Sequence, residues 1–243
     1  MVHKTSFSLI CPCLNEEGNV IELAERFFKS AMMNSVNSEI VFIDDGSNDG
    51  TWAKMNEIKN RFPDQVVLVQ HPRNKGIPYA WKSGIENATG SIVGLIDSDL
   101  QNPPESAIDL YLCLVSESLD LVRGVRKPTF HTDLSRKIMS KMLNSLLNFI
   151  FGMQSSDNKS GFIVGKVDVV LKLVNHTEKY NHFQTFIGVS TRNLALRQLE
   201  IATPFMRRSD GESFLNGKTI KTTLEVLRDI PKAMKEYGWR RIK

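Results

Sequence analysis

Short apolar runs alternate with amphipathic stretches through the first half of this chain, and that alternation constrains the fold more than any other feature. The apolar runs are rich in Val and Ile, and helical periodicity follows each of them. The predicted strands are Ser6–Cys11, Glu39–Ile43, Val66–Gln70, Ser91–Ile96 and Leu119–Val122. The predicted helices are Val20–Met33, Thr51–Phe62, Pro78–Ala88 and Pro104–Ser118. This order predicts an α/β fold with a mostly parallel central sheet and helices on both faces.

The second half of the chain has a less regular pattern. We predict a basic loop over Gly124–Thr132, which is placed to act as a lid over a nearby site. A long helix is predicted over Asp133–Phe151 with Asp133 as its cap, and a further helix over Thr219–Leu227 before a basic tail. We therefore predict one domain over residues 1–218, with halves 1–123 and 124–218, and a C-terminal helix and tail over 219–243.

Charge and cysteine content limit the possible partners and the compartment. The 31 Lys and Arg residues exceed the 27 Asp and Glu residues by a net charge of +4. This surplus suits an anionic ligand or an acidic membrane surface, but it is too small to indicate nucleic acid. The odd count of three cysteines is typical of a reducing, cytoplasmic protein. No apolar run is long enough for a signal peptide or a membrane span, so we expect a cytoplasmic protein, with peripheral attachment to the cytoplasmic face of a membrane left open.

Polar clusters follow three of the predicted strands, at the point where each strand ends. Asn15 and Glu16 follow the first strand, Asp44 and Asp45 the second, and Asp97 opens the cluster after the fourth. In open parallel sheets ligands bind beyond the carboxyl ends of the strands. The three clusters therefore predict one shared site.

The cluster at residues 97–101 has the pattern of a metal site. Asp97, Asp99 and Gln101 alternate with other residues at a strand end, so their oxygen atoms can converge. Hard divalent cations such as Mg²⁺ or Mn²⁺ prefer oxygen ligands and keep positions open for phosphates. The alternative is a solvated acidic turn that binds no metal.

These motifs together resemble a family 2 inverting glycosyltransferase of GT-A fold, and specifically the dolichol-phosphate mannose synthase branch. The resemblance covers most of the chain, and residues 43–51 (Ile-Asp-Asp-Gly-Ser-Asn-Asp-Gly-Thr) carry its most specific motif. The other matching motifs are residues 11–17, 71–76, 97–105, 156–162 and 208–213. One residue departs from the pattern, because Ile163 stands where relatives usually carry Arg.

The resemblance implies a nucleotide-sugar-binding half at residues 1–123 and an acceptor-binding half at residues 124–218. It implies that Asp99 and its neighbours hold a metal that meets the diphosphate, with Asp99 also taking a catalytic part. The implied metal ligands are Asp97, Asp99 and Gln101, and the implied donor-nucleotide residues are Pro12, Asn15, Glu16, Asp44 or Asp45, Lys75, Asp97 and Ser98.

Asp157 is the second catalytic candidate that the resemblance implies. In relatives that use a sugar hydroxyl as acceptor, an acidic residue removes the hydroxyl proton. A phosphate acceptor is already ionised near neutral pH, and Asp157 would then orient the site. A plain loop aspartate is the third alternative.

The resemblance also implies a site for a lipid phosphate, made by Arg126, Arg136, Ser140 and Arg208. Guanidinium groups suit phosphate because they stay charged and offer paired donors. The predicted helix over 133–151 adds an apolar face beside basic residues, with Leu134, Ile138, Met142, Leu146 and Ile150 at four-residue spacing. Such a face is typical of a helix in a membrane interface, but also of a core or dimer helix.

The function that the resemblance implies is a metal-dependent inverting transfer of a hexose from a nucleotide diphosphate sugar to a polyprenyl phosphate at the cytoplasmic membrane face. The alternative enzyme transfers to a sugar hydroxyl in cell-surface polysaccharide or glycolipid synthesis. A non-catalytic nucleotide-sugar-binding subunit is the alternative of another class. A homo-oligomer or a membrane-anchored partner is compatible with either enzyme.

Overall fold

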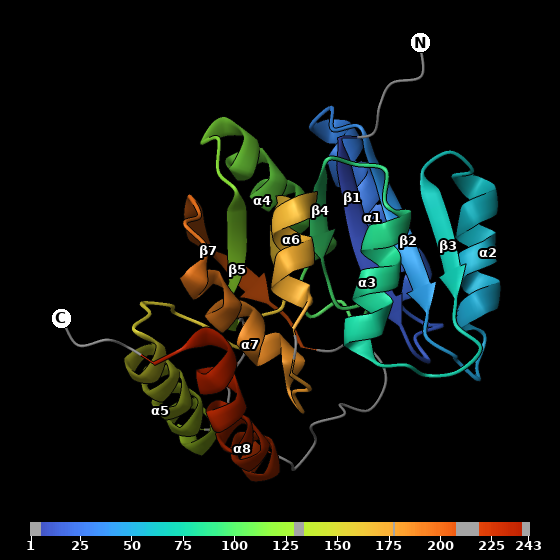
Figure 1. The fold of residues 1–243 in the computed structure, drawn as a ribbon. Coiled ribbons are helices and arrows are strands. Elements are labelled where there is room, and N and C mark those ends of the chain that lie inside the picture. Colours follow the sequence, from blue (N-terminus) through green and yellow to red (C-terminus); the bar gives the residue numbers. More distant parts are fainter. Residues whose placement is uncertain (1–5, 129–133, 177, 208–218, 240–243) are drawn as a thin grey trace.

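The computed structural model of the chain describes residues 6–128, 134–176, 178–207 and 219–239 (Figure 1). Its strands are β1 (Phe7–Cys13), β2 (Ser38–Asp44), β3 (Val66–Gln70), β4 (Ile92–Leu95), β5 (Leu121–Pro128), β6 (Ile163–Lys166) and β7 (Gln198–Phe205). Its helices are α1 (Val20–Met33), α2 (Thr51–Arg61), α3 (Ile77–Asn87), α4 (Pro104–Ser116), α5 (Leu134–Phe151), α6 (Val167–Val174), α7 (Phe183–Ser190), the 3₁₀ turn η1 (Thr191–Asn193) and α8 (Thr219–Tyr237).

The strands form one sheet in the order β3-β2-β1-β4-β6-β5-β7. β1 pairs in parallel with β2 and β4, β2 with β3, and β5 with β7. β6 alone among these strands runs antiparallel, between β4 and β5. Because of this reversal, β6 begins at the edge where its neighbours end. The segment before β6, residues 155–162, therefore lies at the same edge as the ends of β1, β2, β4, β5 and β7.

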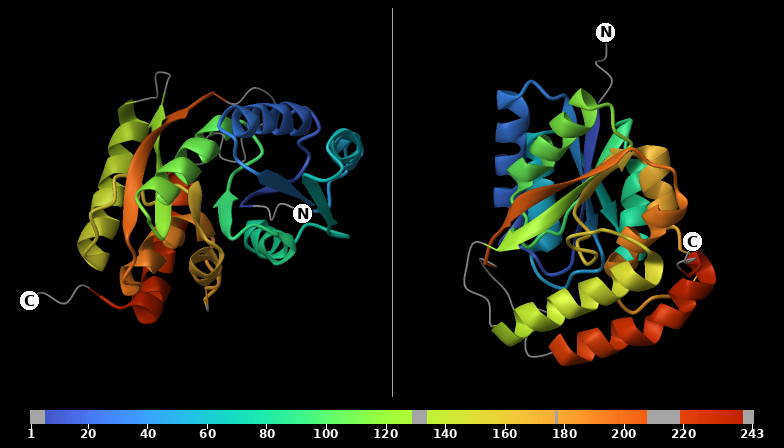
Figure 2. Two further views of the ribbon diagram at one scale, coloured as in Figure 1. Left: turned by 90° about the horizontal axis from the view of Figure 1, so that it is seen from above. Right: turned by 90° about the vertical axis from the view of Figure 1, so that its left-hand side faces the viewer.

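Helices cover both faces of the sheet, as Figure 2 shows from two directions. Successive residues of β1 point to opposite faces, so Leu9 packs with α1, α2 and α4, whereas Ile10 packs with α3, α6 and α7. Both residues are completely buried. The predicted α/β fold with a mostly parallel sheet is confirmed.

A third apolar cluster joins α5 and α8 to α7, away from the sheet. Leu143, Leu147 and Phe151 of α5 pack with residues of α7 and α8, namely Phe186, Val189, Val226, Ile230 and Ala233. α5 and α8 lie side by side, as Figure 1 and the right-hand view of Figure 2 show. α8 is longer than predicted, because it continues from Leu227 to Tyr237 with Pro231 inside it.

The predicted elements of the first half agree with the structure to within two residues at each end, except that the strand predicted over Leu119–Val122 ends six residues too early. The prediction of a loop from Gly124 is wrong, because β5 continues through Pro128. Its partner β7 supplies the reason, since Gly124 to Pro128 pair with Ile201 to Phe205. Residues 129–133, with the rest of that predicted loop and the predicted cap Asp133, lie outside the described residues. In the part of the chain that the structure describes, no helix is long and apolar enough to cross a membrane.

Candidate active site

The loops that follow β1 and β2 are tied together by Asn15. Its backbone has a left-handed φ of 56°, and its N–H donates to Ser47 Oγ at 3.0 Å. Its side-chain Oδ1 accepts from the Asn48 N–H at 2.9 Å. The next residue, Glu16, is buried, and its N–H donates to Thr51 Oγ1 at 2.8 Å. These bonds make one fixed rim at the carboxyl edge of the sheet.

Asp44 and Asp45 are both buried, and each carboxylate accepts hydrogen bonds from the protein. Asp44 accepts from Ser47 N–H at 2.9 Å and from Gln70 Nε2 at 3.0 Å. Asp45 contacts His71 Nδ1 at 2.7 Å. It also accepts from the backbone N–H groups of residues 75 and 76, at 3.0 and 2.8 Å. Asp45 thus fixes the loop after β3, and a contact of either carboxylate with a nucleotide stays a prediction.

The acidic cluster after β4 brings the carboxylates of Asp97 and Asp99 close enough to interact. Leu100 has a left-handed φ of 59°, and the turn lets Gln101 N–H donate to Asp99 Oδ1 at 3.1 Å. Gln101 Nε2 donates to the Met206 carbonyl at 3.3 Å, next to the end of β7. Asp97 Oδ1 accepts from Gln184 Nε2 of α7 at 3.0 Å. No pattern in the sequence indicates this role of Gln184.

The electrostatics of this cluster suit a divalent cation. The pKa of Asp97 is raised to about 6, chiefly by burial and also by the charge of Asp99, while the hydrogen bond from Gln184 opposes the rise. A shared cation would relieve the repulsion between Asp97 and Asp99, and carboxylate and amide oxygens are the ligands that Mg²⁺ and Mn²⁺ accept. No group of three or more His, Cys, Asp or Glu residues that could hold a metal occurs within the described residues. One or two carboxylates with substrate phosphates suffice for Mg²⁺.

Asp157 forms a two-point ion pair with Arg126 of β5. Arg126 Nε donates to Asp157 Oδ2 at 2.6 Å and Nη2 donates to Oδ1 at 2.8 Å. Burial alone would raise the pKa of Asp157, but the hydrogen bonds and charge of Arg126 hold it below its usual value. The guanidinium also lies over the Phe205 ring, 5.4 Å from its centroid. Asp157 is therefore an ionised, oriented group.

Lys159 links the same loop to α5. Its N–H donates to Asp157 Oδ1 at 3.1 Å, and its Nζ donates to Ser140 Oγ at 2.7 Å. Ser140 is one of the predicted acceptor-phosphate residues. The bond from Lys159 places it beside the Asp157 loop. The side chains of Arg136 and Arg208, the other two arginines of that prediction, lie outside what the structure describes.

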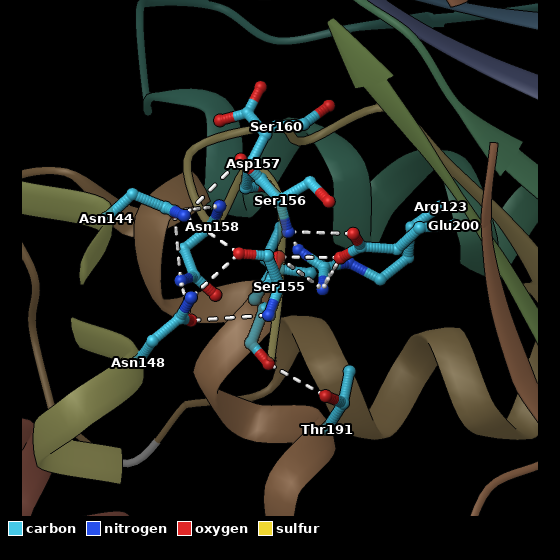
Figure 3. Close-up of polar contacts among 12 residues, drawn as sticks. Arg123, Asn144, Asn148, Ser155, Ser156, Asp157, Asn158, Ser160, Thr191 and Glu200 are labelled. Carbon is cyan, nitrogen blue, oxygen red and sulfur yellow. Dashed lines mark hydrogen bonds and ion pairs between the residues drawn. The ribbon is translucent and has the colours of Figure 1, made fainter. Parts of the chain in front are cut away.

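A buried polar network fixes the loop from residue 155 to residue 160 (Figure 3). Arg123 Nη1 donates to Glu200 Oε1 at 3.0 Å and to Ser155 Oγ at 3.2 Å, while its Nη2 donates to the Asp157 carbonyl at 3.2 Å. Glu200 also accepts from Ser155 Oγ at 2.6 Å and from Ser156 N–H at 2.8 Å. β5 and β7 thereby hold the start of the loop.

Asparagines of α5 hold the other side of this loop, as Figure 3 shows. Asn144 Nδ2 and Asn148 Nδ2 both donate to the Ser155 carbonyl at 2.8 Å. Asn158, which is completely buried, donates through Nδ2 to both of their Oδ1 atoms, at 3.0 and 2.8 Å. The four-residue spacing of Asn144 and Asn148 places them on one face of the helix. These two residues could not be predicted from the sequence, because an Asn in a helix is usually a solvent-exposed side chain.

The remaining predicted donor residues lie around the rim. Pro12 is in β1 opposite Ile43 of β2. Ser98 is buried in the turn after β4, and Lys75 is exposed. Their contacts with a nucleotide stay predictions.

A sequence model of the family "Glycosyl transferase family 2" matches residues 8–176, well over half of the chain. The chain belongs to glycosyl transferase family 2. The resemblance predicted from the motifs is confirmed. Ile163, the departure from the motif, is completely buried in β6 of this family 2 fold and packs in the core between the sheet and α3.

Curated relatives of this family 2 chain carry lipid-phosphate transferase names. An undecaprenyl-phosphate 4-deoxy-4-formamido-L-arabinose transferase of Shewanella sediminis is 32% identical over 207 residues, covering 85% of this chain and 60% of the relative. A dolichol-phosphate mannosyltransferase of Pyrococcus furiosus is 29% identical over 237 residues, covering 95% and 64%. The chain thus spans about three fifths of the length of these relatives.

Solved structures with the same fold support the GT-A-like architecture. The mannosyltransferase PcManGT of Pyrobaculum calidifontis, in complex with GDP-Man and Mn²⁺, has a TM-score of 0.68 at 14% identity, covering 96% of this chain and 65% of that one. Glucosyl-3-phosphoglycerate synthase of Mycobacterium tuberculosis, in complex with Mn²⁺, UDP and phosphoglyceric acid, has a TM-score of 0.63 at 18% identity, covering 98% and 80%. At identities this low, these matches show that the family 2 chain shares their fold.

Proposed function

We propose that this chain is a metal-dependent inverting glycosyltransferase that moves a hexose from a nucleotide diphosphate sugar to a polyprenyl phosphate. The names of the curated relatives support this acceptor class, and the family supports the reaction class. The division into a donor half at 1–123, an acceptor half at 124–218 and a C-terminal helix and tail at 219–243 stays part of the proposal.

The state of Asp157 is the observation that carries the choice of acceptor. A general base works best when its pKa lies near the operating pH. Both oxygens of Asp157 are engaged by Arg126, and its pKa is held below the usual value, which makes it a weak base. A phosphate acceptor needs no base, because it is already ionised. A sugar-hydroxyl acceptor would need one, so the alternative transferase is less favoured.

The proposed reaction is one displacement at the anomeric carbon. An oxygen of the acceptor phosphate forms a bond to that carbon, the bond to the diphosphate oxygen breaks, and the configuration inverts. The nucleoside diphosphate leaves with the electron pair. In this reaction Asp157 and Arg126 would orient the attacking phosphate, and the rim around Asn15, Glu16, Asp44 and Asp45 would hold the nucleotide.

Asp97, Asp99 and Gln101 would hold the Mg²⁺ or Mn²⁺. When bound, such a cation supplies positive charge to the departing diphosphate. The protein's own part is to keep the two carboxylates adjacent, through the left-handed turn at Leu100 and the hydrogen bond from Gln184 to Asp97. The cations in the solved neighbours support this part of the proposal.

We propose that the protein works at the cytoplasmic face of a membrane, with α5 against the lipid. Ile138, Met142, Leu146 and Phe149 are exposed on one side of α5, and Lys141 is exposed beside them. An apolar stripe flanked by cations suits the interface of an anionic bilayer. The opposite side of α5 is buried against α7 and α8. The alternative that α5 is an ordinary core helix therefore accounts for that side and leaves the exposed apolar side unexplained.

A transfer assay tests the proposal. Purified protein is given GDP-, UDP- or dTDP-sugars with either a polyprenyl phosphate or a lipid-linked sugar, in Mn²⁺ or in EDTA. We expect metal-dependent transfer to the polyprenyl phosphate alone. Asp99→Ala should abolish transfer, whereas Asp109→Ala, a solvent-facing carboxylate on α4, should keep it. Donor binding without transfer to either acceptor would favour the non-catalytic binding subunit.

A further inference from the structure

The loop that carries Asp157 places a lysine beside the proposed acceptor site. Lys159 donates through its backbone N–H to Asp157 Oδ1 at 3.1 Å, and through Nζ to Ser140 Oγ at 2.7 Å. The buried contacts of Asn158 with Asn144 and Asn148 anchor the residue just before it to α5. The backbone of Lys159 is therefore fixed beside the Asp157 carboxylate, and its ammonium group contacts Ser140 of α5.

The charged side chains around Asp157 leave a phosphate monoester in need of another positively charged side chain. The charge of Arg126 is balanced by Asp157 through two hydrogen bonds. A phosphate monoester carries about −1.5 to −2 charges near pH 7. Asp97 is close enough to Arg126 for each to shift the pKa of the other, and it adds negative charge to the surroundings. The Arg126–Asp157 pair by itself cannot offset that anion.

Lys159 and Ser140 offer two donors to a single oxyanion. A hydroxyl that accepts a hydrogen bond from an ammonium group still has its own proton to donate. An anion that accepts the Ser140 proton lies within reach of the ammonium, because Nζ and Oγ are 2.7 Å apart. Charge-assisted bonds of this kind are roughly twice as strong as neutral ones.

We propose that Lys159 binds the acceptor phosphate together with Ser140 and sets the preference of the site for phosphate monoesters over neutral hydroxyl acceptors. This inference rests on the proposed function. It adds a phosphate ligand from the Asp157 loop to the predicted residues Arg126 and Ser140.

Steady-state kinetics of Lys159→Met test the inference, with the polyprenyl phosphate and the donor sugar varied in turn. We expect the KM for the polyprenyl phosphate to rise about 10- to 100-fold, because one charge-assisted bond is lost. The KM for the donor and the melting temperature should stay within the error of the wild type. Lys159→Arg should restore most of the acceptor affinity, and Lys172→Met, an exposed lysine on α6, serves as the matched control.

A double-mutant cycle keeps the test independent of folding effects. Lys159→Met and Ser140→Ala should each raise the acceptor KM, and their combination should raise it by less than the product, since both act on one oxyanion. Inorganic phosphate should compete with the lipid phosphate in the wild type and more weakly in Lys159→Met, which separates recognition of the phosphate from recognition of the lipid chain. An unchanged acceptor KM in Lys159→Met, with an active wild type, overturns the inference alone. A wild type that transfers only to hydroxyl acceptors overturns the proposed function, and the inference falls with it.

Discussion

Replacing Asp157 with Asn tests the ion pair that underlies the proposed acceptor. Asn keeps the shape and one acceptor oxygen for Lys159 N–H, but it removes the charge that Arg126 contacts. Breaking a fully buried pair by removing one partner costs about 3–5 kcal/mol. The side chains of Arg126 and Asp157 are 29% and 13% exposed, so solvent screening reduces the expected cost to about 2–3 kcal/mol. In a domain of this size that lowers the melting temperature by about 5–10 °C.

The pH dependence of this cost has a definite sign. The folded-state pKa of Asp157 lies below its ordinary value of 3.8, so the unfolded chain binds the proton more readily. The stabilising effect of the carboxylate is therefore complete above about pH 5 and is lost as the pH falls through the folded-state pKa, below about pH 4. Urea unfolding at pH 7 and at pH 3.5 should show a large difference between wild type and Asp157→Asn at the higher pH and a smaller one at the lower.

The same variant separates the two roles of Asp157 in catalysis. If Asp157 only orients the site, kcat with polyprenyl phosphate should fall by less than about tenfold. Loss of a general base costs about 10²- to 10⁴-fold. A drop of that size, in a variant shown to be folded, would refute the argument from the lowered pKa. So would an Asp157→Asn protein as stable as the wild type at pH 7.

Three further variants test other parts of the site. In EDTA, Asp97→Asn should be more stable to urea than the wild type by about 1–2 kcal/mol above pH 7, and the gap should close below about pH 4. The reason is that the folded-state pKa of Asp97 is raised to about 6, so that ionising Asp97 lowers the free energy of unfolding. The Asp97→Asn variant should also lose metal-dependent donor binding in a thermal-shift assay. Glu200→Gln should cost about 3 kcal/mol in urea unfolding, because it leaves the buried charge of Arg123 without its carboxylate. Phe149→Glu should weaken sedimentation with anionic phospholipid vesicles by about tenfold without a change in melting temperature, since 62% of Phe149 is exposed. Val115→Glu on α4 is its matched control, and equal loss in both would contradict the placement of the lipid against α5.

The sequence was most informative where strands are buried on both faces. β1 and β2 are nearly continuous apolar runs, and each ends in a polar cluster, so both the sheet and the position of the site could be predicted. The acidic residues 97–101 follow the same rule. The carboxyl ends of parallel strands meet at one edge, and this general property made the convergence predictable.

The elements after residue 124 depend on pairings that local patterns do not encode. β7 is an edge strand of mixed burial, so no apolar pattern in the sequence indicates that residues 124–128 of β5 pair with it. β6 has only four residues and runs antiparallel to its neighbours. The direction of a strand in a sheet produces no periodic pattern in its sequence. Lys159 contacts Ser140 and Gln184 contacts Asp97 only because the fold brings distant segments together. Local sequence patterns therefore could not predict these two contacts.

α5 has three rows of side chains with three different surroundings, and this limits how the helix can evolve. Ser140, Asn144 and Asn148 face the Asp157 loop, Leu143, Leu147 and Phe151 face α7 and α8, and Ile138, Met142 and Phe149 are exposed. An inserted or deleted residue turns every later position by about 100° around the helix axis. A deletion would turn the asparagines towards the apolar cluster, and an insertion would turn the leucines towards the loop. We therefore expect descendants of this chain to exchange residues freely along the exposed row, while the length of α5 stays constant.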